Sequence, residues 1–386
     1  MTLTCSGMNT HKPEGKIHHW LQLLRTPGVG PATAQQLLAH CGSVQAIFTE
    51  PKHAAALPGL RAETREHLLR GNHGDDTIAA DLRWAEQADH HIITRDDARY
   101  PERLASLPQP PLLLYVWGDP DYLLQPQLAM VGSRNPTAAG RRTAQDFARY
   151  LANAGITITS GLARGIDAAC HQGALDALAG TVALVAHGLD MIYPPEHRQL
   201  ASQIAGNGAV VSEMPIGVGP QRSYFPRRNR LISGLTLGTL VVEAAVKSGS
   251  LITARHALEQ GREIFAIPGS IHNPLARGCH QLIRDGAKLV ETADDILQEL
   301  AHVLPPNHGD QTATPADGGD ENSANCAPPL DPDHQKLLKC LQFEPAAIDE
   351  LVERSGFSAA EVASMLLILE LKGSVVCDGG RYTRIA

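Results

Sequence analysis

Residues 128–137, Leu-Ala-Met-Val-Gly-Ser-Arg-Asn-Pro-Thr, decide how the central part of this chain folds. Four apolar residues suited to a buried strand run into Gly132, and a helical pattern begins close to Ala138. The same order returns at residues 157–167, where a short apolar run leads into Ser-Gly-Leu-Ala-Arg-Gly-Ile-Asp. A buried strand, a glycine turn and a helix form the repeating unit of a parallel α/β sheet.

The alternation of apolar strands and helical stretches continues from about Gln127 to Leu300. Strands that are apolar on both faces and alternate with helices predict a doubly wound, mostly parallel sheet. Short glycine-containing links follow most strand ends, and sheets of this kind bind their ligands at those ends. We predict strands at Leu128–Val131, Thr157–Thr159, Val182–Ala186, Ala209–Val211, Thr239–Val242, Ile264–Ile267 and Lys288–Val290, preceded by one at Leu112–Trp117, with helices at Thr143–Asn153, Asp167–Leu178 and Leu251–Gln260.

A smaller helical unit precedes the sheet, from about Ile17 to Gly71. It contains two glycine turns between apolar helical runs, Thr26-Pro-Gly-Val-Gly-Pro and Leu57-Pro-Gly-Leu, which is the pattern of paired helix-hairpin-helix motifs. The free N–H groups at such a helix start can hold a backbone phosphate. A second interpretation, in which this unit only packs or dimerises, stays open because the second turn lacks the Gly-x-Gly of the first.

The chain ends in a third unit, behind a linker rich in Pro, Gly, Asp and Asn. Helical patterns at His334–Gln342, Ala347–Arg354 and Ser358–Lys372 lead into Ser374–Arg384, a hairpin with a Gly-Gly turn. Three helices and a hairpin are the outline of a winged helix. We therefore predict a helical domain at 17–75, the α/β domain at 76–303 with a lead-in at 76–126, a flexible linker at 304–332, and a winged-helix domain at 333–386.

The composition argues against several classes of protein. A formal net charge of -8 argues against a nonspecific coat on nucleic acid, although an acidic body can still carry a local basic groove. Seven cysteines without a C-x-x-C pair favour a reducing compartment over disulfides or a zinc site, so we expect no bound metal. No run approaches the roughly 20 apolar residues of a membrane span. Residues 1–19 lack the apolar core of a signal peptide, so we expect a cytoplasmic protein.

An arginine stripe stands out against this acidic background in Ser223–Gly238, Ser-Tyr-Phe-Pro-Arg-Arg-Asn-Arg-Leu-Ile-Ser-Gly-Leu-Thr-Leu-Gly. No carboxylate occurs from Met214 to Val242. Guanidinium groups match phosphate oxygens in a planar, bidentate way and keep their charge at any working pH. The stripe therefore predicts a polyanionic partner, and the four arginines between Met214 and Val242 are Arg222, Arg227, Arg228 and Arg230.

Three other turns offer anion-binding groups. Gly132-Ser-Arg opens a helix, so that backbone N–H groups and Arg134 together suit a phosphate. Arg164, in the next turn, is equally compatible with a structural role. Lys247-Ser-Gly-Ser, with Thr253 one turn later, places hydroxyl groups around a glycine as a nest for one phosphate. A complete Walker A loop and a complete dinucleotide-binding turn are both missing, so we predict no nucleotide cofactor.

No set of residues assembles an enzymatic site in the sequence. Glu213 and Glu243 follow strands close to the arginines, and charge pairing is the expected role of both. His187 and Asp190 have no serine or cysteine nucleophile in a recognisable elbow. Asp167 is expected to cap its helix. We therefore predict a binding protein and not an enzyme.

Together these segments resemble the DprA (Smf) family of DNA-processing proteins. The helical front and the winged tail resemble the longer, three-domain members of that family. The resemblance implies a Rossmann-like α/β domain between a helical domain of the SAM or helix-hairpin-helix kind and a winged helix. One departure is Gly278-Cys-His-Gln, where many members carry Asn at the position of His280. The motifs that carry the resemblance are Val131-Gly-Ser-Arg, Ser160-Gly-Leu-Ala-Arg-Gly-Ile-Asp, Phe225-Pro-Arg-Arg-Asn-Arg-Leu-Ile-Ser-Gly-Leu, Ser248-Gly-Ser-Leu-Ile-Thr-Ala and Gly261-Arg-Glu-Ile-Phe-Ala-Ile-Pro-Gly-Ser-Ile.

The resemblance implies a protein that binds single-stranded DNA, protects incoming DNA during natural transformation and recombination, and loads the RecA recombinase onto it. It also implies a homodimer through the Rossmann-like domain and no catalytic activity. Tyr224 and Phe225 would add base stacking, unless Phe225 belongs to the core. The resemblance carries phosphate contact onto Ser133, Arg134, Arg227, Asn229, Arg230, Lys247, Ser248, Gly249 and Ser250. Our predicted DNA-binding set adds Gly132, Arg164, Arg228 and Thr253.

Two other functions stay open. A phosphoribohydrolase-like nucleotide enzyme would use Ser233-Gly-Leu-Thr-Leu-Gly-Thr and Glu243, which keep the shape of a Pro-Gly-Gly-x-Gly-Thr loop but lack its glycine pair. A transcription factor would use the winged tail, but the third helix expected there carries Glu361, Glu370 and a single lysine. A recognition helix normally has more positive charge. A protein-docking or regulatory role is therefore favoured for the tail.

Overall fold

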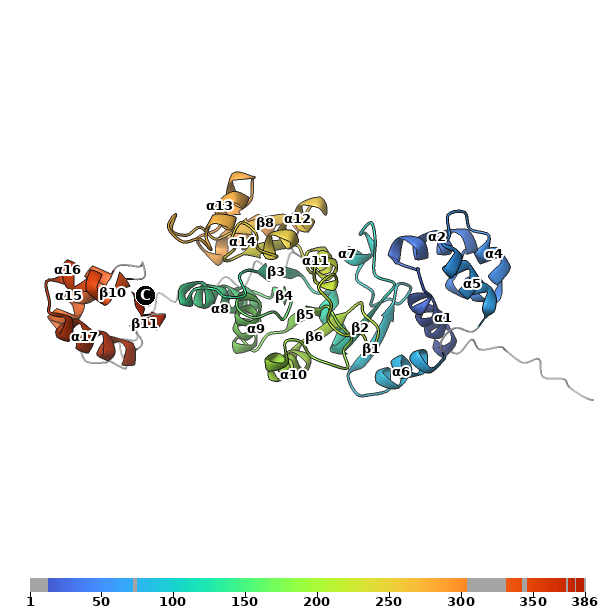
Figure 1. The fold of residues 1–386 in the computed structure, drawn as a ribbon, viewed down its shortest axis with the longest axis horizontal. Helices are drawn as coiled ribbons and strands as arrows, with labels where there is room; N and C mark the ends of the chain where they lie inside the picture. The colour runs from blue at the N-terminus through green and yellow to red at the C-terminus, as the bar shows by residue number, and fades with distance from the viewer. Residues whose placement is uncertain are drawn as a thin grey trace, which may run out of the picture.

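The computed structural model describes residues 13–71, 75–303, 331–341, 346–372, 374–378 and 380–384. These residues form an N-terminal helical domain, a central α/β domain with a mostly parallel sheet, and a C-terminal winged helix (Figure 1). This arrangement confirms the predicted fold class. The predicted linker, residues 304–332, lies outside the described residues as far as residue 330.

The first glycine turn of the helical domain packs tightly against the helix that contains Thr64. Gly28 has a φ of +75°, and a Cβ placed there would lie 2.5 Å from the hydroxyl oxygen of Thr64. That hydroxyl donates a hydrogen bond to the carbonyl of Pro27 at 2.8 Å, so the turn is packed directly against α5. The helices are α1 (Pro13–Arg25), α2 (Pro31–Cys41), α3 (Val44–Thr49), α4 (Pro51–Ala55), α5 (Ala62–Arg70) and α6 (Asp75–Ala85). Helix α6 falls almost wholly in the predicted lead-in 76–126, and we count it with the helical domain because its Asp81 pairs with Arg25 of α1.

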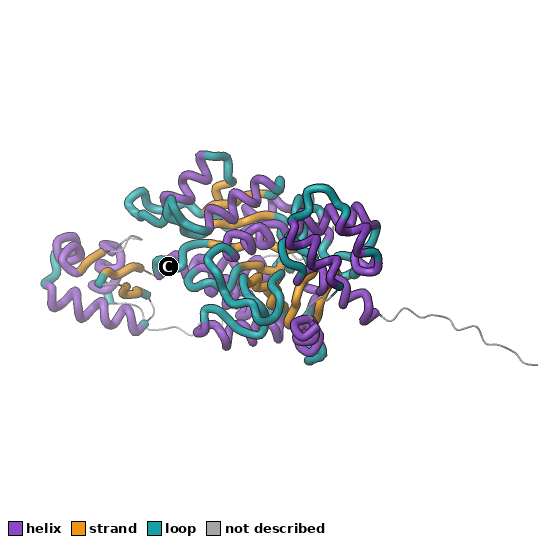
Figure 2. Tube along the Cα trace, turned by 45° about the vertical axis from the view of Figure 1, so that its right-hand side comes forward, coloured by secondary structure: helices purple, strands orange, loops and turns teal. Residues whose placement is uncertain are grey.

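The central sheet has nine strands in the order β1-β2-β6-β5-β4-β3-β7-β8-β9, enclosed by helices (Figure 2). The strands from β6 to β9 in this order pair in parallel, whereas β2 pairs antiparallel with both β1 and β6. Each predicted strand is present within one residue of its expected ends. The strands are β1 (His90–Thr94), β2 (Leu113–Gly118), β3 (Gln127–Val131), β4 (Thr157–Ser160), β5 (Thr181–Val185), β6 (Ala209–Ser212), β7 (Gly238–Val241), β8 (Glu263–Ala266) and β9 (Lys288–Leu289).

Strand β3 shows why helices cover both faces of the sheet. Its apolar side chains alternate, so that Ala129 and Val131 pack with residues of α11 and α12. Leu128 and Met130 pack with residues of α8 and α9 on the opposite face. The helices of this domain are α7 (Glu102–Ala105), α8 (Ala138–Asn153), α9 (Ile166–Asp176), α10 (Arg198–Asn207), α11 (Tyr224–Leu235), α12 (Ser250–Glu259), α13 (Arg277–Arg284) and α14 (Ala293–Leu300), with 3-10 turns η1 (Pro120–Leu124) and η2 (Pro195–His197).

The winged helix has a core of its own, with Leu337, Leu351 and Leu366 among its fully buried residues. Ser358 caps its third helix, and the carboxylate of Glu361 accepts the backbone N–H of Ser358 in a capping box. The elements are α15 (Pro332–Leu341), β10 (Ala346–Ala347), α16 (Ile348–Ser355), α17 (Ala359–Leu371), β11 (Val375–Asp378) and β12 (Arg381–Arg384), and the strands form a small sheet in the order β10-β12-β11.

His171 on α9 is a buried histidine that folding keeps neutral. Its Nδ1 lies 2.8 Å from the hydroxyl of Thr181, and that hydroxyl donates to the carbonyl of Ile158 at 2.6 Å. Nδ1 of His171 must therefore donate its proton to Thr181. Burial, with smaller contributions from His197 and Arg228, lowers the pKa of His171 from 6.5 to about 3.

This burial predicts a pH-dependent loss of stability. Between pH 6.5 and about 3 the unfolded chain binds a proton at His171 that the folded protein does not bind. The contribution of neutral His171 to the stability of the folded protein is therefore fully present above pH 6.5. Below pH 6.5 the free energy of unfolding falls by about 1.4 kcal/mol per pH unit. Urea unfolding at pH 7 and pH 5 should show a smaller pH-dependent loss in His171→Gln than in the wild type. Equal losses in both proteins would contradict this assignment.

Candidate nucleic-acid interface

The largest concentration of predicted site residues lines one cavity at the carboxyl edge of the sheet. Strand β3 lies between β4 and β7 at the point where the strand order reverses, which is where doubly wound sheets bind ligands. The loops after these strands, together with α11 and α12, enclose a cavity of about 710 Å³. Ten of the predicted residues line it: Gly132, Ser133, Arg134, Arg228, Asn229, Lys247, Ser248, Gly249, Ser250 and Thr253.

The loop after β3 reaches the cavity because its backbone is tightly packed. A Cβ on Gly132 would lie 2.6 Å from a side-chain carbon of Ile166, so only glycine fits there without displacing α9. Arg134, which follows, is exposed and forms no ion pair with any residue that the structure describes. Its guanidinium carbon lies 5.7 Å from the ring centroid of Phe225, as in a cation–π contact. A charge and an aromatic ring therefore stand side by side at the cavity.

Arg228 is the buried cation of the site, with 5% of its surface exposed. A Cβ on Gly161 would lie 1.7 Å from one of its terminal nitrogens, so the guanidinium occupies the space above that glycine. Burial lowers the pKa of Arg228 to about 10, and the charge of Asp167 opposes this shift, so the group stays protonated at neutral pH. Its Nε has no hydrogen-bond partner among the described residues. A buried donor of this kind suits an anionic ligand.

Asp167 faces Arg228 from the first turn of α9. It was expected to cap its helix, but the N-cap of α9 is Gly165, and the carboxylate of Asp167 accepts the backbone N–H groups of Gly161 and Ala163 at 3.1 and 3.3 Å. Burial raises the pKa of Asp167, and the positive charge of Arg228 opposes that shift. Asp167 is the single carboxylate lining the described cavity, against the cations Arg134, Arg222, Arg228 and Lys247.

The loop before α12 supplies hydroxyl groups and a helix N-terminus. The hydroxyls of Ser248 and Ser250 lie 2.7 Å apart, and the backbone N–H of Ser250 points at the Ser248 hydroxyl at 3.3 Å. Asn229 of α11 donates to the carbonyl of Gly249 at 3.5 Å, which ties this loop to the arginine helix. Because α12 begins at Ser250, the positive end of its dipole also points at the cavity.

Three predicted site residues do not line this cavity. Arg230 has a side chain that is 14% exposed, and it donates to buried Glu213 and to the carbonyl of Gln109, both at 2.6 Å. Burial lowers the pKa of Arg230, and the charge of Glu213 opposes the shift. Arg227 pairs with the same carboxylate at 2.9 Å. Arg164 is exposed and pairs with Glu196.

The two glutamates next to the stripe behave differently from each other. The predicted charge pairing is confirmed for Glu213, which holds two arginines. It is wrong for Glu243, whose carboxylate accepts the backbone N–H and the hydroxyl of Thr137 at 2.9 and 2.7 Å. A Cβ on Gly140 would lie 2.3 Å from this carboxylate, so the glutamate is seated against the first turn of α8. Its negative charge is balanced by the helix dipole.

Tyr193, Arg222 and Phe225 also line the cavity, although they lie outside the predicted DNA-binding set. Phe225 is half-buried, and its ring centroid lies 6.1 Å from that of Tyr193. The arginine stripe was a signal for Arg222. The sequence contains no comparable signal for Tyr193, which enters from the loop after β5.

Two negative findings apply to the residues that the structure describes. Within these ranges there is no helix long and apolar enough to cross a membrane. Nor do any three His, Cys, Asp or Glu side chains come together there in a way that would hold a metal ion.

Comparison with known proteins assigns the family. The family model for DNA recombination-mediator protein A matches residues 91–301, the DprA-like N-terminal HHH domain matches residues 14–68, and the DprA winged helix domain matches residues 321–381. The chain belongs to the DprA family. The resemblance seen in the sequence motifs is thereby confirmed for all three DprA domains.

Relatives within the DprA family cover much of the chain. It is 43% identical over 313 residues to Protein Smf of Escherichia coli, covering 80% of this chain and 81% of that protein. It is 44% identical over 211 residues to the DNA processing protein DprA of Bacillus subtilis, covering 54% of this chain and 71% of that protein. The matches therefore extend well beyond the cavity.

Solved DprA structures share the fold. The X-ray structure of DprA from Streptococcus pneumoniae matches with a TM-score of 0.66 and 34% identity, covering 73% of this chain and 97% of that one. A structure of DprA from Helicobacter pylori matches with a TM-score of 0.51 and 29% identity, covering 56% of this chain and 97% of that one. The H. pylori structure is described as giving insight into that protein's single-stranded DNA binding mode.

The position of Glu243 predicts a purely structural effect. Glu243→Ala should lower the free energy of unfolding by about 1–3 kcal/mol, because the partly buried N–H and hydroxyl of Thr137 both lose their acceptor. Glu196→Ala removes an exposed carboxylate instead and should leave the denaturation midpoint unchanged. Urea denaturation of both variants measures the difference. A wild-type midpoint for Glu243→Ala would show that the N-terminus of α8 does not need this carboxylate.

Proposed function

We propose that the cavity between β3, β4 and β7 binds the sugar-phosphate backbone of single-stranded DNA. The observation that carries the proposal is the charge imbalance of the site: four cations and one carboxylate line the cavity of a chain whose formal charge is -8. Local potential, and not net charge, governs where a polyanion binds. The buried and incompletely paired guanidinium of Arg228 has the clearest requirement for an anion.

Binding by this cavity would follow the backbone and not the base sequence. The loop after β3, helix α11 and the loop before α12 each present a separate donor set, so that successive phosphates can be held by Ser133 with Arg134, by Arg228 with Asn229, and by Lys247 to Ser250. Phe225 and Tyr193 offer aromatic faces on which bases can stack without sequence preference. The structure of the H. pylori relative, described by its single-stranded DNA binding, supports this choice of polymer.

The three predicted residues outside the cavity receive different parts in this proposal. Arg230, with Glu213, fixes the orientation of α11, and a free Arg230 is not required for contact with DNA. Arg227 keeps part of its side chain exposed on the same helix and can approach a bound strand. Arg164 lies at the surface of the next loop as an outer contact.

In the cell, we propose, the protein protects incoming single-stranded DNA and loads RecA onto it during natural transformation and recombination. This role rests on membership of the DprA family and on relatives named as DNA processing proteins. We also propose a cytoplasmic homodimer without catalytic activity. Exposed Leu258, Ile271 and Leu289, around β8 and β9 at the end of the sheet, support a dimer surface on the α/β domain.

The phosphoribohydrolase-like alternative has less support from the geometry. The segment that would replace the nucleotide loop begins with Ser233–Leu235, and these residues form the buried last turn of α11. They do not line the cavity. Incubation with nucleoside monophosphates distinguishes the two functions, since release of free base would favour the enzyme.

Arg134→Ala should weaken binding of a fluorescent oligothymidine by roughly tenfold, because a charge-assisted phosphate contact is lost. The slope of log affinity against log salt should become shallower by about 0.7, the value for one phosphate contact on a single strand. Arg149→Ala is the matched control, since Arg149 lies on α8 and pairs with Asp146 and Asp176 away from the cavity. Equal affinities for both variants would rule out this cavity as the binding site.

Gly161→Ala should test the buried cation without changing any charge. The new Cβ would lie 1.7 Å from Arg228 and displace its guanidinium, which is the far end of a flexible side chain. We expect a folded protein whose affinity for oligothymidine falls several-fold. Gly206→Ala is the control, because a Cβ at Gly206 meets nothing within 4 Å. A folded Gly161→Ala protein with wild-type affinity would remove Arg228 from the interface.

A further inference from the structure

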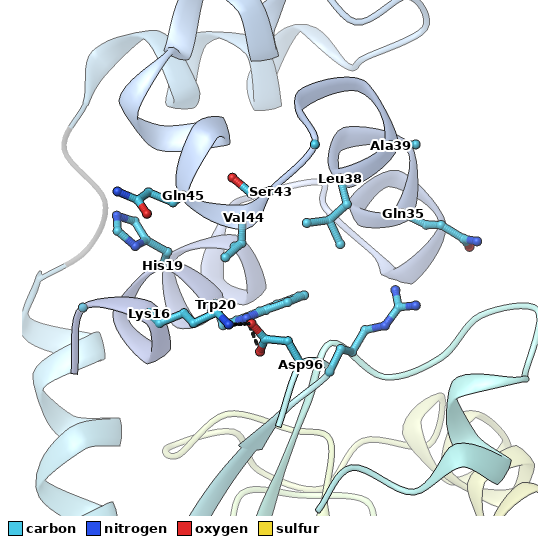
Figure 3. A pocket seen from close by; sticks show the side chains of 13 residues that line it. Lys16, His19, Trp20, Gln35, Leu38, Ala39, Ser43, Val44, Gln45 and Asp96 are labelled. Atoms are coloured by element: carbon cyan, nitrogen blue, oxygen red, sulfur yellow. Dashed lines mark hydrogen bonds and ion pairs between the residues drawn. The ribbon is translucent and has the colours of Figure 1, made fainter. Parts of the chain in front are cut away.

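Among the described residues, two polar contacts join the helical domain to the α/β domain. At the first, Asp96, just after β1, accepts the indole N–H of Trp20 at 3.0 Å and pairs with Lys16 (Figure 3). This contact lies beside a hollow of about 830 Å³ at the seam between the domains. The second contact is deeper, and it involves Arg25 of α1 and Asp81 of α6.

At the second contact, two charged side chains grip one residue of the α/β domain. The carboxylate of Asp81 has no exposed area and accepts Nε and Nη2 of Arg25 at 2.6 and 2.8 Å. Arg25 also donates to the carbonyl of Ile216 at 3.1 Å, while the N–H of Ile216 donates to Asp81 at 3.2 Å. Both backbone groups of Ile216 are therefore held by the helical domain.

Ile216 lies in the loop between β6 and α11, residues 213–223, which connects this contact to the cavity. The loop begins at Glu213, the carboxylate that holds Arg227 and Arg230. Arg222, one residue before the end of the loop, lines the cavity. Helix α11, which follows, supplies further cavity residues. The path of this loop thus sets the position of Arg222 and the orientation of helix α11 at the cavity.

The opposite side of the loop is held by the neighbouring loop after β5. The N–H of Gly217 donates to Asp190 at 3.0 Å, and the N–H of Gly188 donates to the carbonyl of Val218 at 2.7 Å. Residues 216–218 are thereby clamped from two sides, and one side of the clamp belongs to the helical domain. Removing one partner of a buried ion pair leaves an uncompensated charge. The clamp therefore cannot lose Asp81 or Arg25 without a change in the loop.

We propose that Arg25 and Asp81 are positioning residues for single-strand binding: the helical domain acts through Ile216 to hold loop 213–223, and with it Arg222, in the binding arrangement. Neither residue touches the strand in this proposal. It rests on the proposed function of the cavity, and it gives the helical domain a role in binding that requires no contact of its own with DNA. The contact at Asp96 does not reach this loop and has no such role.

The test compares Asp81→Asn with Asp96→Asn. Both variants remove one carboxylate charge from a contact between the same two domains. Asp81→Asn should weaken oligothymidine binding about five- to thirtyfold and flatten the salt slope. We expect the same two changes from Arg222→Ala, which removes the cavity cation of this loop. Asp96→Asn should keep wild-type affinity even if its melting temperature falls. The double variant Asp81→Asn with Arg222→Ala should bind at most about twofold more weakly than whichever single variant binds less tightly. The two losses are not additive because both changes remove the same contact, the one made by Arg222.

Each other outcome overturns a defined part of the proposal. Asp81→Asn with a wild-type circular dichroism spectrum and wild-type affinity would make Asp81 a structural residue only. Equal weakening by Asp96→Asn would assign the effect to domain docking in general, against the clamp on loop 213–223. If Arg134→Ala leaves binding unchanged, the cavity itself is wrong. If Arg134→Ala weakens binding and Asp81→Asn does not, only the positioning role fails.

Arg25→Lys covers the case in which Asp81→Asn does not fold. Lysine keeps a positive charge beside Asp81 but lacks the planar fork that reaches both Asp81 and the Ile216 carbonyl. We expect a folded protein with a smaller loss of affinity in the same direction, about two- to fivefold. Unchanged affinity in a folded Arg25→Lys protein, with the same salt slope as the wild type, would overturn the proposal.

Discussion

The backbone of Ser133 joins the three loops on which the whole site depends. Its N–H donates to the carbonyl of Glu243 after β7 at 2.7 Å, and its carbonyl accepts the N–H of Ile166 after β4 at 3.1 Å. Gly165, with a φ of +80°, makes this possible, because a Cβ there would lie 2.3 Å from the Ser133 carbonyl oxygen. Main-chain bonds, and not the charged side chains, therefore fix the loops in which the cations stand.

The arginines at and around the cavity divide into two groups. Arg227 and Arg230 share the buried carboxylate of Glu213, so part of their positive charge is neutralised within the protein. Arg134 and Arg222 form no ion pair with a described residue, and Arg228 faces Asp167 without one. One set of guanidinium groups thus holds helix α11 in place through Glu213, and a second set supplies positive charge to the cavity. An acidic protein can present a basic surface in this way without an excess of basic residues.

The sheet could be predicted from the sequence because its strands are short apolar runs bounded by glycine turns. The family could be predicted because its motifs occur in the expected order. It was insufficient for β1, which begins with His90 and His91 and carries no apolar alternation at its start. It predicted no helix at Tyr224–Leu235, where Pro226 and the arginines obscure the periodicity, although proline is tolerated in a first turn. The partner of each charged side chain could not be predicted from the sequence either. Glu213 and Glu243 both follow strands, and only tertiary packing decides that one holds arginines and the other holds a helix N-terminus.

The two flanking domains relate differently to the sheet. The apolar core of the helical domain is continuous with that of the α/β domain, since Trp20 and Leu37 belong to one buried cluster with Tyr115 and Val210. The buried cluster of the winged helix contains residues of that domain alone. A change in the core between α1 and β2 therefore has a packed route to the loops of the sheet, and the clamp on Ile216 lies on that route. The core of the winged helix offers no equivalent route, so any influence of that domain on the cavity must act through its surface.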